Sequence, residues 1–174
     1  MITTVLLFPY WTQNQNLKVD FDLRAALPQD TAPFNTGMVF RTRVFNELHQ
    51  VSVNFDERST GFIWFFSFLV WFSQLDKTYG KNLIILLDEP GLSLHGRAQE
   101  NLLKFIKEKL SSNHQVIYTT HSPFMVDIEN LSGIRTVQDL STGEKTIGTK
   151  VSSEVLKSDS DTIFPLQTAL GYYC

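Results

Sequence analysis

Two uninterrupted apolar segments, about thirty residues apart, dominate the hydrophobic pattern of this chain. The first, residues 83–87, contains five aliphatic side chains in succession and is followed by Asp88-Glu89-Pro90. The second, residues 116–118, is followed by Thr119-Thr120-His121-Ser122-Pro123. Such segments are typical of strands buried on both faces of a parallel sheet. Because ligands bind at the carboxyl ends of strands in open α/β sheets, the polar residues after both strands are candidates for phosphate chemistry.

Two helices are predicted from the spacing of apolar residues, one between these strands and one before them. Residues 97–110 are predicted to form a helix whose apolar residues share one face: Ala98, Leu102, Leu103, Phe105, Ile106 and Leu110. The resulting β-α-β unit should have a right-handed crossover. A second helix is predicted from Ser59 to about Tyr79, with Gly80 as its C-cap. Its residues 62–72 are apolar apart from Ser67, which is too short for a membrane span and indicates a buried helix.

The remaining pattern predicts antiparallel strands and short helices. Residues 17–23 alternate as a half-buried strand, and residues 39–45 and 50–55 are predicted to form a hairpin. A second hairpin is predicted from residues 134–140 and 145–151 around Ser141-Thr142-Gly143. Short helices are predicted near Glu154 and over residues 165–170. The fold class is therefore α/β, a mostly parallel sheet with flanking helices and an N-terminal antiparallel β portion.

Composition narrows the range of functions. The net charge is −3 and the pI about 5.8, so the chain has no overall basic footprint for nucleic acid. Arg41, Arg43 and Arg58 could form a local basic patch, although a solvated strand face explains them more simply. The single cysteine excludes an internal disulfide and, with no signal peptide evident in residues 1–10, indicates a cytoplasmic protein.

Each candidate site residue has a structural and a functional interpretation. Asp88 and Glu89 are either solvated acids at a strand end, or a metal-holding carboxylate followed by a general base. His121 is either a hydrogen-bonded structural residue or a catalytic one, followed by a Ser-Pro pair suited to starting a helix. Residues 59–61 are either a plain N-cap or an anion site at a helix N-terminus.

The spacing of these motifs favours the functional interpretation through a family resemblance. Residues 83–90 resemble the Walker B segment of an ABC-type ATPase, and Ser93-Leu94-His95 resembles its D-loop. Residues 119–122 resemble its switch-histidine loop, and residues 58–61 stand where its signature motif would be. Together with the aromatic segment 62–68, residues 8–171 resemble the OLD (overcoming lysogenisation defect) family. Its members are predicted ATP-dependent endonucleases in the SMC/RecF-like branch of ABC ATPases, with a P-loop NTPase fold.

The resemblance implies a role for each candidate residue, with ATP and Mg²⁺ as cofactors. Asp88 would hold Mg²⁺, Glu89 would be the general base and His121 would contact the γ-phosphate. The signature residues Ser59, Thr60 and Gly61 would reach nucleotide held by an opposite subunit. The D-loop residues Ser93 and His95 would lie near that nucleotide, with His95 contacting the partner subunit or the attacking water, unless it is only a loop histidine.

The phosphate-binding P-loop of these ATPases has no counterpart in this sequence. None of the nine glycines fits G-x-x-x-x-G-K-[ST], and Gly80-Lys81 lacks both the earlier glycine and the following hydroxyl. In the resembling family the P-loop comes before this region and a Toprim nuclease domain follows it. The chain therefore resembles the second half of an ATPase head: an antiparallel region (1–57), the motif-bearing core (58–130), and a hairpin with a connector (131–174).

Two functions follow, with different partners. The chain is either an ATP-hydrolysing head segment used in DNA processing or phage defence, or a non-catalytic module that docks on an intact ATPase. A DExx-type helicase fits less well, because a Thr-Thr-His strand is typical of ABC heads. The expected partner is a second copy or a P-loop-bearing ATPase, with DNA contacted through the assembly and no membrane. An exposed sheet edge and apolar surface would favour dimerisation or aggregation.

Overall fold

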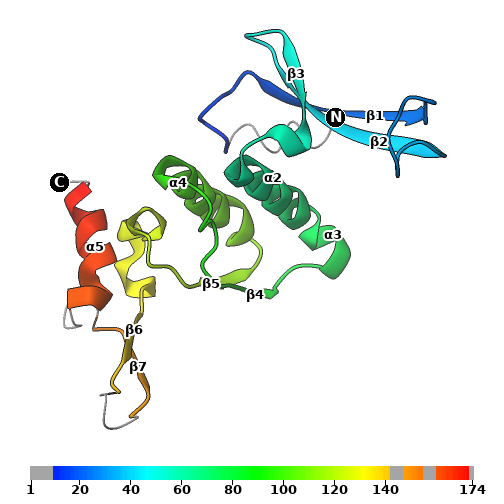
Figure 1. The fold of residues 1–174 in the computed structure, drawn as a ribbon. Coiled ribbons are helices and arrows are strands. Elements are labelled where there is room, and N and C mark those ends of the chain that lie inside the picture. Colours follow the sequence, from blue (N-terminus) through cyan, green and yellow to red (C-terminus); the bar gives the residue numbers. More distant parts are fainter. Residues whose placement is uncertain (1–9, 142–146, 155–159, 173–174) are drawn as a thin grey trace. The chain divides into compact units, whose positions relative to one another are not determined.

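The computed structural model describes residues 10–141, 147–154 and 160–172, which form two compact units (Figure 1). Unit 1 contains the described residues up to Ile85 together with Gly91–Val116. Unit 2 contains Leu86–Pro90 and the described residues from Ile117 onward. Within the described part of the chain, no helix is long and apolar enough to cross a membrane.

A three-stranded antiparallel sheet forms the first part of unit 1. Its strands are β1 (Leu17–Ala25), β2 (Met38–Asn46) and β3 (Val51–Asn54), in the order β1-β2-β3. The predicted strand and hairpin are therefore confirmed. One face of β1 and β2 buries Leu17, Val19 and Val44, as the alternation of apolar residues requires.

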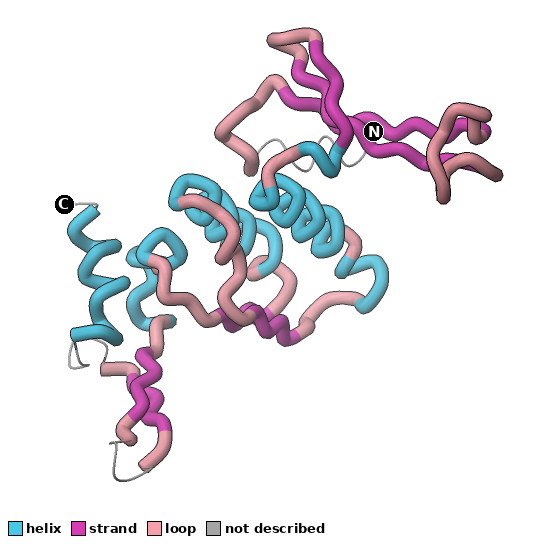
Figure 2. The backbone as a smooth tube through the Cα atoms, in the orientation of Figure 1, coloured by secondary structure: helices cyan, strands magenta, loops and turns pink. Residues whose placement is uncertain are grey.

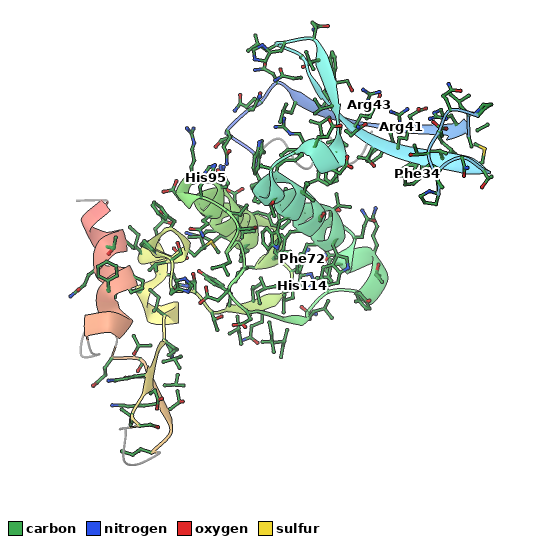
Figure 3. All side chains as sticks on the ribbon, in the orientation of Figure 1. Phe34, Arg41, Arg43, Phe72, His95 and His114 are labelled. Carbon is green, nitrogen blue, oxygen red and sulfur yellow. The ribbon has the colours of Figure 1, made fainter. Side chains whose placement is uncertain are left out.

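The opposite face of β1 and β2 carries the arginines that could have formed a basic patch. In the register of the two strands, Arg41 is opposite Asp22 and Arg43 is opposite Asp20. Figure 3 shows both arginines on β2. Each arginine thus faces an acidic residue across the strands, an arrangement that stabilises the pair. Two of the three arginines therefore lie on a strand face of mixed charge, where Arg43 is half-buried and donates to the Ser52 carbonyl at 3.2 Å.

The loop between β1 and β2 is held by an ion pair that makes its stability depend on pH. Arg24 donates to both carboxylate oxygens of Asp30, at 2.7 and 2.9 Å, and the Leu27 N–H donates to Asp30 at 2.8 Å. The Arg24 guanidinium, followed by the Leu27 N–H, lowers the pKa of Asp30 from 3.8 to about 2. The charged form is therefore favoured in the folded loop.

Acidification should release this loop before it affects more deeply buried structure. Because the folded pKa of Asp30 is lowered, its stabilisation is present above pH 3.8 and is lost as the pH falls through about 2. We expect hydrogen exchange at the Leu27 amide, corrected for the intrinsic pH dependence, to rise across this range. Asp30→Asn should raise the exchange at pH 5 and remove the transition. A transition that persists in Asp30→Asn would contradict this assignment.

The helices of unit 1 contain most of its core. They are α2 (Thr60–Ser73), α3 (Leu75–Tyr79) and α4 (Gly96–Phe105), which continues as a π-helical turn over Ile106–Leu110. Both predicted helices are confirmed. The helix predicted from Ser59 to about Tyr79 is interrupted at Gln74, which divides it into α2 and α3. Gly80 is the C-cap of α3, with a φ of 81°. Figure 1 shows α2 beside α4, in agreement with an edge-on contact between Phe68 and Phe105, whose ring centroids are 6.2 Å apart.

Burial along α2 is one-sided. The buried residues are Phe62, Phe65, Phe66, Leu69 and Phe72. Trp71 is 58% exposed, which corrects the prediction of a helix buried all round. Residues at i, i+3, i+4, i+7 and i+10 share a face, so the helix is amphipathic in its packing although almost every side chain is apolar.

The two apolar segments form β4 (Ile84–Leu87) and β5 (Gln115–Tyr118), which pair with each other (Figure 2). The Gln115 N–H donates to the Leu83 carbonyl at 2.9 Å, and the Thr119 N–H donates to the Leu87 carbonyl at 3.0 Å. From the first hydrogen bond to the second, the position advances by four residues along both strands, so the strands are parallel. The connecting α4 completes the predicted β-α-β unit.

A mostly parallel sheet is not observed in the described residues. Besides β4 and β5, the described strands are antiparallel, because short connections join them as hairpins. Burial of β4 on both faces was also wrong: Ile85 is buried, but Ile84 and Leu86 are 66% and 72% exposed. Five aliphatic residues in succession predict a strand that would be stable with both faces buried. Whether other elements cover both faces depends on the rest of the fold.

A buried histidine holds the start of β5. His114 Nδ1 accepts the Leu83 N–H at 3.3 Å, so its Nε2–H donates to Asp76 at 2.6 Å. Asn113 donates to the other Asp76 oxygen at 2.7 Å. The His114 side chain is only 1% exposed, and Figure 3 shows it in the interior of unit 1. These contacts connect α3, β4 and β5 through groups that are paired rather than left unsatisfied.

Unit 2 continues from β5 into short elements. Two 3-10 turns, Pro123–Met125 and Ile128–Gly133, precede β6 (Thr136–Asp139) and β7 (Thr149–Ser152), which pair antiparallel. The second predicted hairpin is confirmed, although most of its turn lies outside the described residues. The final helix, α5 (Ser160–Tyr172), is longer than predicted and contains Pro165 in its interior.

Two helices predicted in unit 2, near Glu154 and after Ser122-Pro123, are not observed as predicted. Glu154 itself is not in a helix, and residues 155–159, on which the rest of that predicted helix falls, lie outside the described residues. Ser122 and Pro123 do begin a helical turn, but it is a three-residue 3-10 turn. The Ser-Pro pair thus fixes where the turn begins, not how far it extends.

Candidate functional site: a carboxylate and histidine cluster

Asp88 and Glu89 leave the end of β4 in unit 2. The backbone of Glu89 has a φ of 44°, in the left-handed region that residues with a Cβ rarely adopt. Such a conformation costs about 1–2 kcal/mol and is maintained only where surrounding contacts hold it. Local strain of this kind is frequent at functional sites.

The contact that holds this turn comes from the end of β5. Thr119 Oγ1 donates to Asp88 Oδ1 at 2.6 Å and accepts the Glu89 N–H at 3.0 Å. One hydroxyl therefore connects the first carboxylate with the backbone of the second. The motif containing Thr119 was recognised in the sequence, but no role was assigned to this side chain. Only the parallel pairing of β4 with β5, which places Thr119 beside Leu87, could have indicated it.

His121 lies on the other side of Glu89. Its Nδ1 is 2.7 Å from Glu89 Oε1, a hydrogen-bond distance. The Nδ1–H donates to the carboxylate, because an ionised carboxylate only accepts. This tautomer leaves Nε2 free to face outward, and the His121 side chain is 70% exposed. Asp88, Glu89 and His121 thus form one connected cluster, as the sequence predicted from residues more than thirty positions apart.

The cluster is open enough to receive a ligand. Asp88 is exposed and the Glu89 side chain is 33% exposed. No group of three or more metal-ligating side chains is present among the described residues. Mg²⁺ keeps several waters and is commonly bound through one or two carboxylates together with substrate phosphates. Asp88 fits such a site, since the Thr119 contact occupies only one of its oxygens.

The residues of the signature-like segment lie in unit 1, at the start of α2. Ser59 is the N-cap, and its hydroxyl accepts the Phe62 N–H at 3.3 Å. Thr60 is the first helical residue and is exposed. A Cβ on Gly61 would lie 3.0 Å from the Ser93 carbonyl oxygen, so the D-loop-like segment packs directly on this helix start. Gly61 is therefore required by close packing as well as by any ligand.

Ser93 and His95, predicted from the resemblance to a D-loop, precede α4. Ser93 is exposed, and His95 is the exposed N-cap residue of α4, without a side-chain capping bond (Figure 3). Gly91 has a φ of 78°, and a Cβ there would lie 2.8 Å from Leu102. The loop can therefore form only with glycine at this position.

The predicted site residues thus fall into two clusters. One contains Asp88, Glu89 and His121 with Thr119, within unit 2. The other joins residues 59–61 to Ser93 within unit 1, with His95 at the next helix start. The first cluster combines two carboxylates with a histidine, and the second has the amides of a helix N-terminus, which favour anions.

Comparison with known proteins identifies the class to which these features belong. A family model for the AAA ATPase domain matches residues 5–126, so the chain belongs to this family. An uncharacterised protein of Methanocaldococcus jannaschii, MJECL43, is 32% identical over 117 residues. That match covers 66% of this chain but 29% of the relative.

Solved structures show the same fold. The Smc head domain with a coiled coil and joint from Pyrococcus yayanosii has a TM-score of 0.56 and 16% identity, covering 99% of this chain and 28% of that one. A structure from work on ATP-driven dimerisation and DNA-stimulated activation of SMC ATPases has a TM-score of 0.54 and 13% identity. The match covers 98% of this chain and 90% of that one. The chain is thus an ATPase-type domain with the P-loop NTPase fold of SMC heads.

Proposed function

We propose that this chain supplies half of an ATP-hydrolysing site in an OLD-like soluble ABC ATPase. The observation that carries the proposal is the connected cluster at the ends of β4 and β5. Thr119 bonds both Asp88 and the Glu89 N–H, at 2.6 and 3.0 Å, and His121 contacts the Glu89 carboxylate directly at 2.7 Å. The family match supports nucleotide use in general. The assignment to the OLD branch, and with it DNA processing or phage defence in the cytoplasm, rests on the sequence resemblance.

The cluster residues have distinct roles in hydrolysis. Asp88 would hold Mg²⁺, and the ion would supply positive charge to offset that of the phosphates. Glu89 orients the attacking water and accepts its proton. His121 donates from Nδ1 to Glu89 and presents Nε2 to the γ-phosphate side of the site. The contact between His121 and Glu89 lets the histidine steady the base. A bond from Nε2 to a phosphate oxygen requires a second ring proton, because a phosphate oxygen only accepts.

The second cluster acts on nucleotide held by another subunit. The free amides at the start of α2, with Ser59, Thr60 and Gly61, suit the phosphate of a nucleotide bound in trans. Ser93 packs against that helix start, so it and His95 lie close to the same surface of unit 1. Thr60 stands where many relatives have glycine, and its Cβ limits how closely phosphate approaches.

The P-loop of the proposed site must come from a partner segment outside this sequence, of the same or another polypeptide, because none of its glycines fits that motif. Exposed apolar side chains on the β4–β5 pair support such a partner: Leu86 is 72% and Ile117 51% exposed. Parallel sheets are normally covered on both faces, so an additional layer would bury these residues. We infer that a P-loop-bearing ATPase segment, or a second copy of the whole assembly, provides that layer and contacts DNA.

Calorimetric titration of Mg-ATP tests the proposal. We expect no micromolar binding by the purified chain alone, because the P-loop normally provides most of the hold on the β- and γ-phosphates. Co-expression with the P-loop-bearing segment of an OLD-like relative should yield a complex that binds and hydrolyses ATP. The matched control is the same segment expressed without this chain.

Each outcome of this titration has a distinct meaning. Micromolar binding by the chain alone would contradict the half-site and indicate an unsuspected phosphate cradle. A stable complex that binds ATP but hydrolyses it no faster than the segment alone would favour the rival function of a non-catalytic module docked on an ATPase.

A further inference from the structure

We propose that Thr119 is a positioning residue that holds Asp88 and Glu89 in their working geometry, a role that rests on the proposed function. The threonine hydroxyl lies between the two acids, 2.6 Å from Asp88 Oδ1 and 3.0 Å from the Glu89 nitrogen. The described bonds of its hydroxyl go to Asp88 and Glu89. Its effect would be exerted entirely through the two carboxylates.

The bonding capacity of the hydroxyl matches this arrangement. A threonine hydroxyl has one proton and two acceptor sites. The proton is directed to the Asp88 carboxylate, and an acceptor site receives the Glu89 N–H. A bond to an ionised acceptor is shorter and stronger than a neutral one, in agreement with the 2.6 Å distance. Valine has the same shape but can make neither bond.

The backbone of Thr119 is itself fixed. Its N–H donates to the Leu87 carbonyl at 3.0 Å, which continues the pairing of β4 with β5. Its branched Cβ restricts rotation about χ1. The hydroxyl is therefore presented from a rigid strand end, which makes a more precise support than a loop does.

Glu89 depends on this support more than Asp88 does. Its φ of 44° is unfavourable for a residue with a Cβ, and the Thr119 hydroxyl bonds its N–H in that conformation. From there the Glu89 carboxylate reaches His121 at 2.7 Å. If the N–H were released, the backbone could relax towards ordinary φ values, and the carboxylate would leave its position beside His121.

The neighbouring Thr120 provides a matched control. Its hydroxyl accepts the Ser122 N–H at 3.0 Å and thus shapes the following loop. No described contact joins it to Asp88 or Glu89. Two adjacent threonines therefore differ in their relation to the carboxylates, and the same substitution can be made at each.

Hydrogen exchange at the Glu89 amide, measured by NMR on the full chain, tests the positioning directly. We expect Thr119→Val to increase exchange about tenfold, the effect of losing one ordinary hydrogen bond. Thr119→Ser should keep the amide protected, and Thr120→Val should leave it unchanged. If Thr119→Val does not fold, Thr119→Ala supplies a second variant without the hydroxyl. Unchanged protection without the hydroxyl, or lost protection in Thr119→Ser, would overturn the inference.

Kinetics in the complex with the P-loop-bearing segment test the consequence for hydrolysis. Misplacement of a catalytic group by about 1 Å costs up to about 100-fold in rate, so Thr119→Val should lower kcat 10- to 100-fold with little change in KM for ATP. Thr119→Ser should restore kcat. An unaltered kcat in Thr119→Val would overturn the positioning role. Absence of hydrolysis by the wild-type complex would instead count against the proposed function, while amide protection would still decide whether Thr119 holds the turn.

Discussion

Replacing Glu89 with Gln should lower ATP hydrolysis by the assembled complex about 100- to 1000-fold, because a positioned general base contributes about 10²–10⁴ to the rate. Glutamine has nearly the same shape as glutamate, and its amide oxygen can still accept the His121 Nδ1–H that now lies 2.7 Å from Glu89 Oε1. The amide cannot accept a proton from water. The loss should therefore appear in kcat, while nucleotide binding is retained.

A control within the same unit separates this effect from a general loss of charge. Glu129 is an exposed glutamate in unit 2, outside the cluster. Glu129→Gln makes the same chemical change and should leave kcat unchanged. Retention of full activity by Glu89→Gln would show that another group takes the proton. An equal loss in both variants would show that acidity of the unit, rather than the position of Glu89, determines the rate.

The elements of the fold were predictable where side chains determine them locally. Alternation along β1 and β2 identified a strand and a hairpin, and the spacing of Ala98, Leu102 and Phe105 identified α4. Ser59 correctly marked the start of α2 and Gly80 the end of α3, since capping depends on the backbone groups of one or two turns. The interruption at Gln74 between them was not predicted. These are properties of short segments, which sequence patterns report well.

The site was predictable as a set of residues but not as a bonded structure. The motif spacing was enough to expect Asp88, Glu89 and His121 at neighbouring strand ends. The left-handed φ of Glu89 and the Thr119 hydroxyl between the two acids depend on the pairing of strands about thirty residues apart. No local pattern contains that information, and glutamate is not a residue expected at positive φ.

Burial was predicted less well, because it depends on which layers are present. The aliphatic run of β4 and the aromatic run of α2 suggested coverage on all sides. Ile84, Leu86 and Trp71 are nevertheless exposed by more than half. Hydrophobicity indicates that a residue favours burial. It does not show whether the covering layer comes from the same segment, which is why these exposed residues support a partner.

Replacing Phe65 with Ala should have the largest effect on stability in unit 1, about 3–5 kcal/mol in the free energy of unfolding. Phe65 lies in α2 with no exposed surface, and its ring centroid is 5.3 Å from that of Trp11. Truncation removes the transfer energy of the ring and leaves a cavity against Trp11. Because domains of this size are stable by about 5–15 kcal/mol, the loss should leave unit 1 close to unfolding.

Tryptophan fluorescence during urea denaturation measures this loss selectively, since all three tryptophans (Trp11, Trp64 and Trp71) belong to unit 1. Trp71→Ala is the matched control: it removes a larger aromatic side chain from the same helix, but one that is 58% exposed. Its cost should be well below that of Phe65→Ala, because water already covers most of that ring. Equal costs would mean that the core of unit 1 does not centre on the Phe65 face of α2.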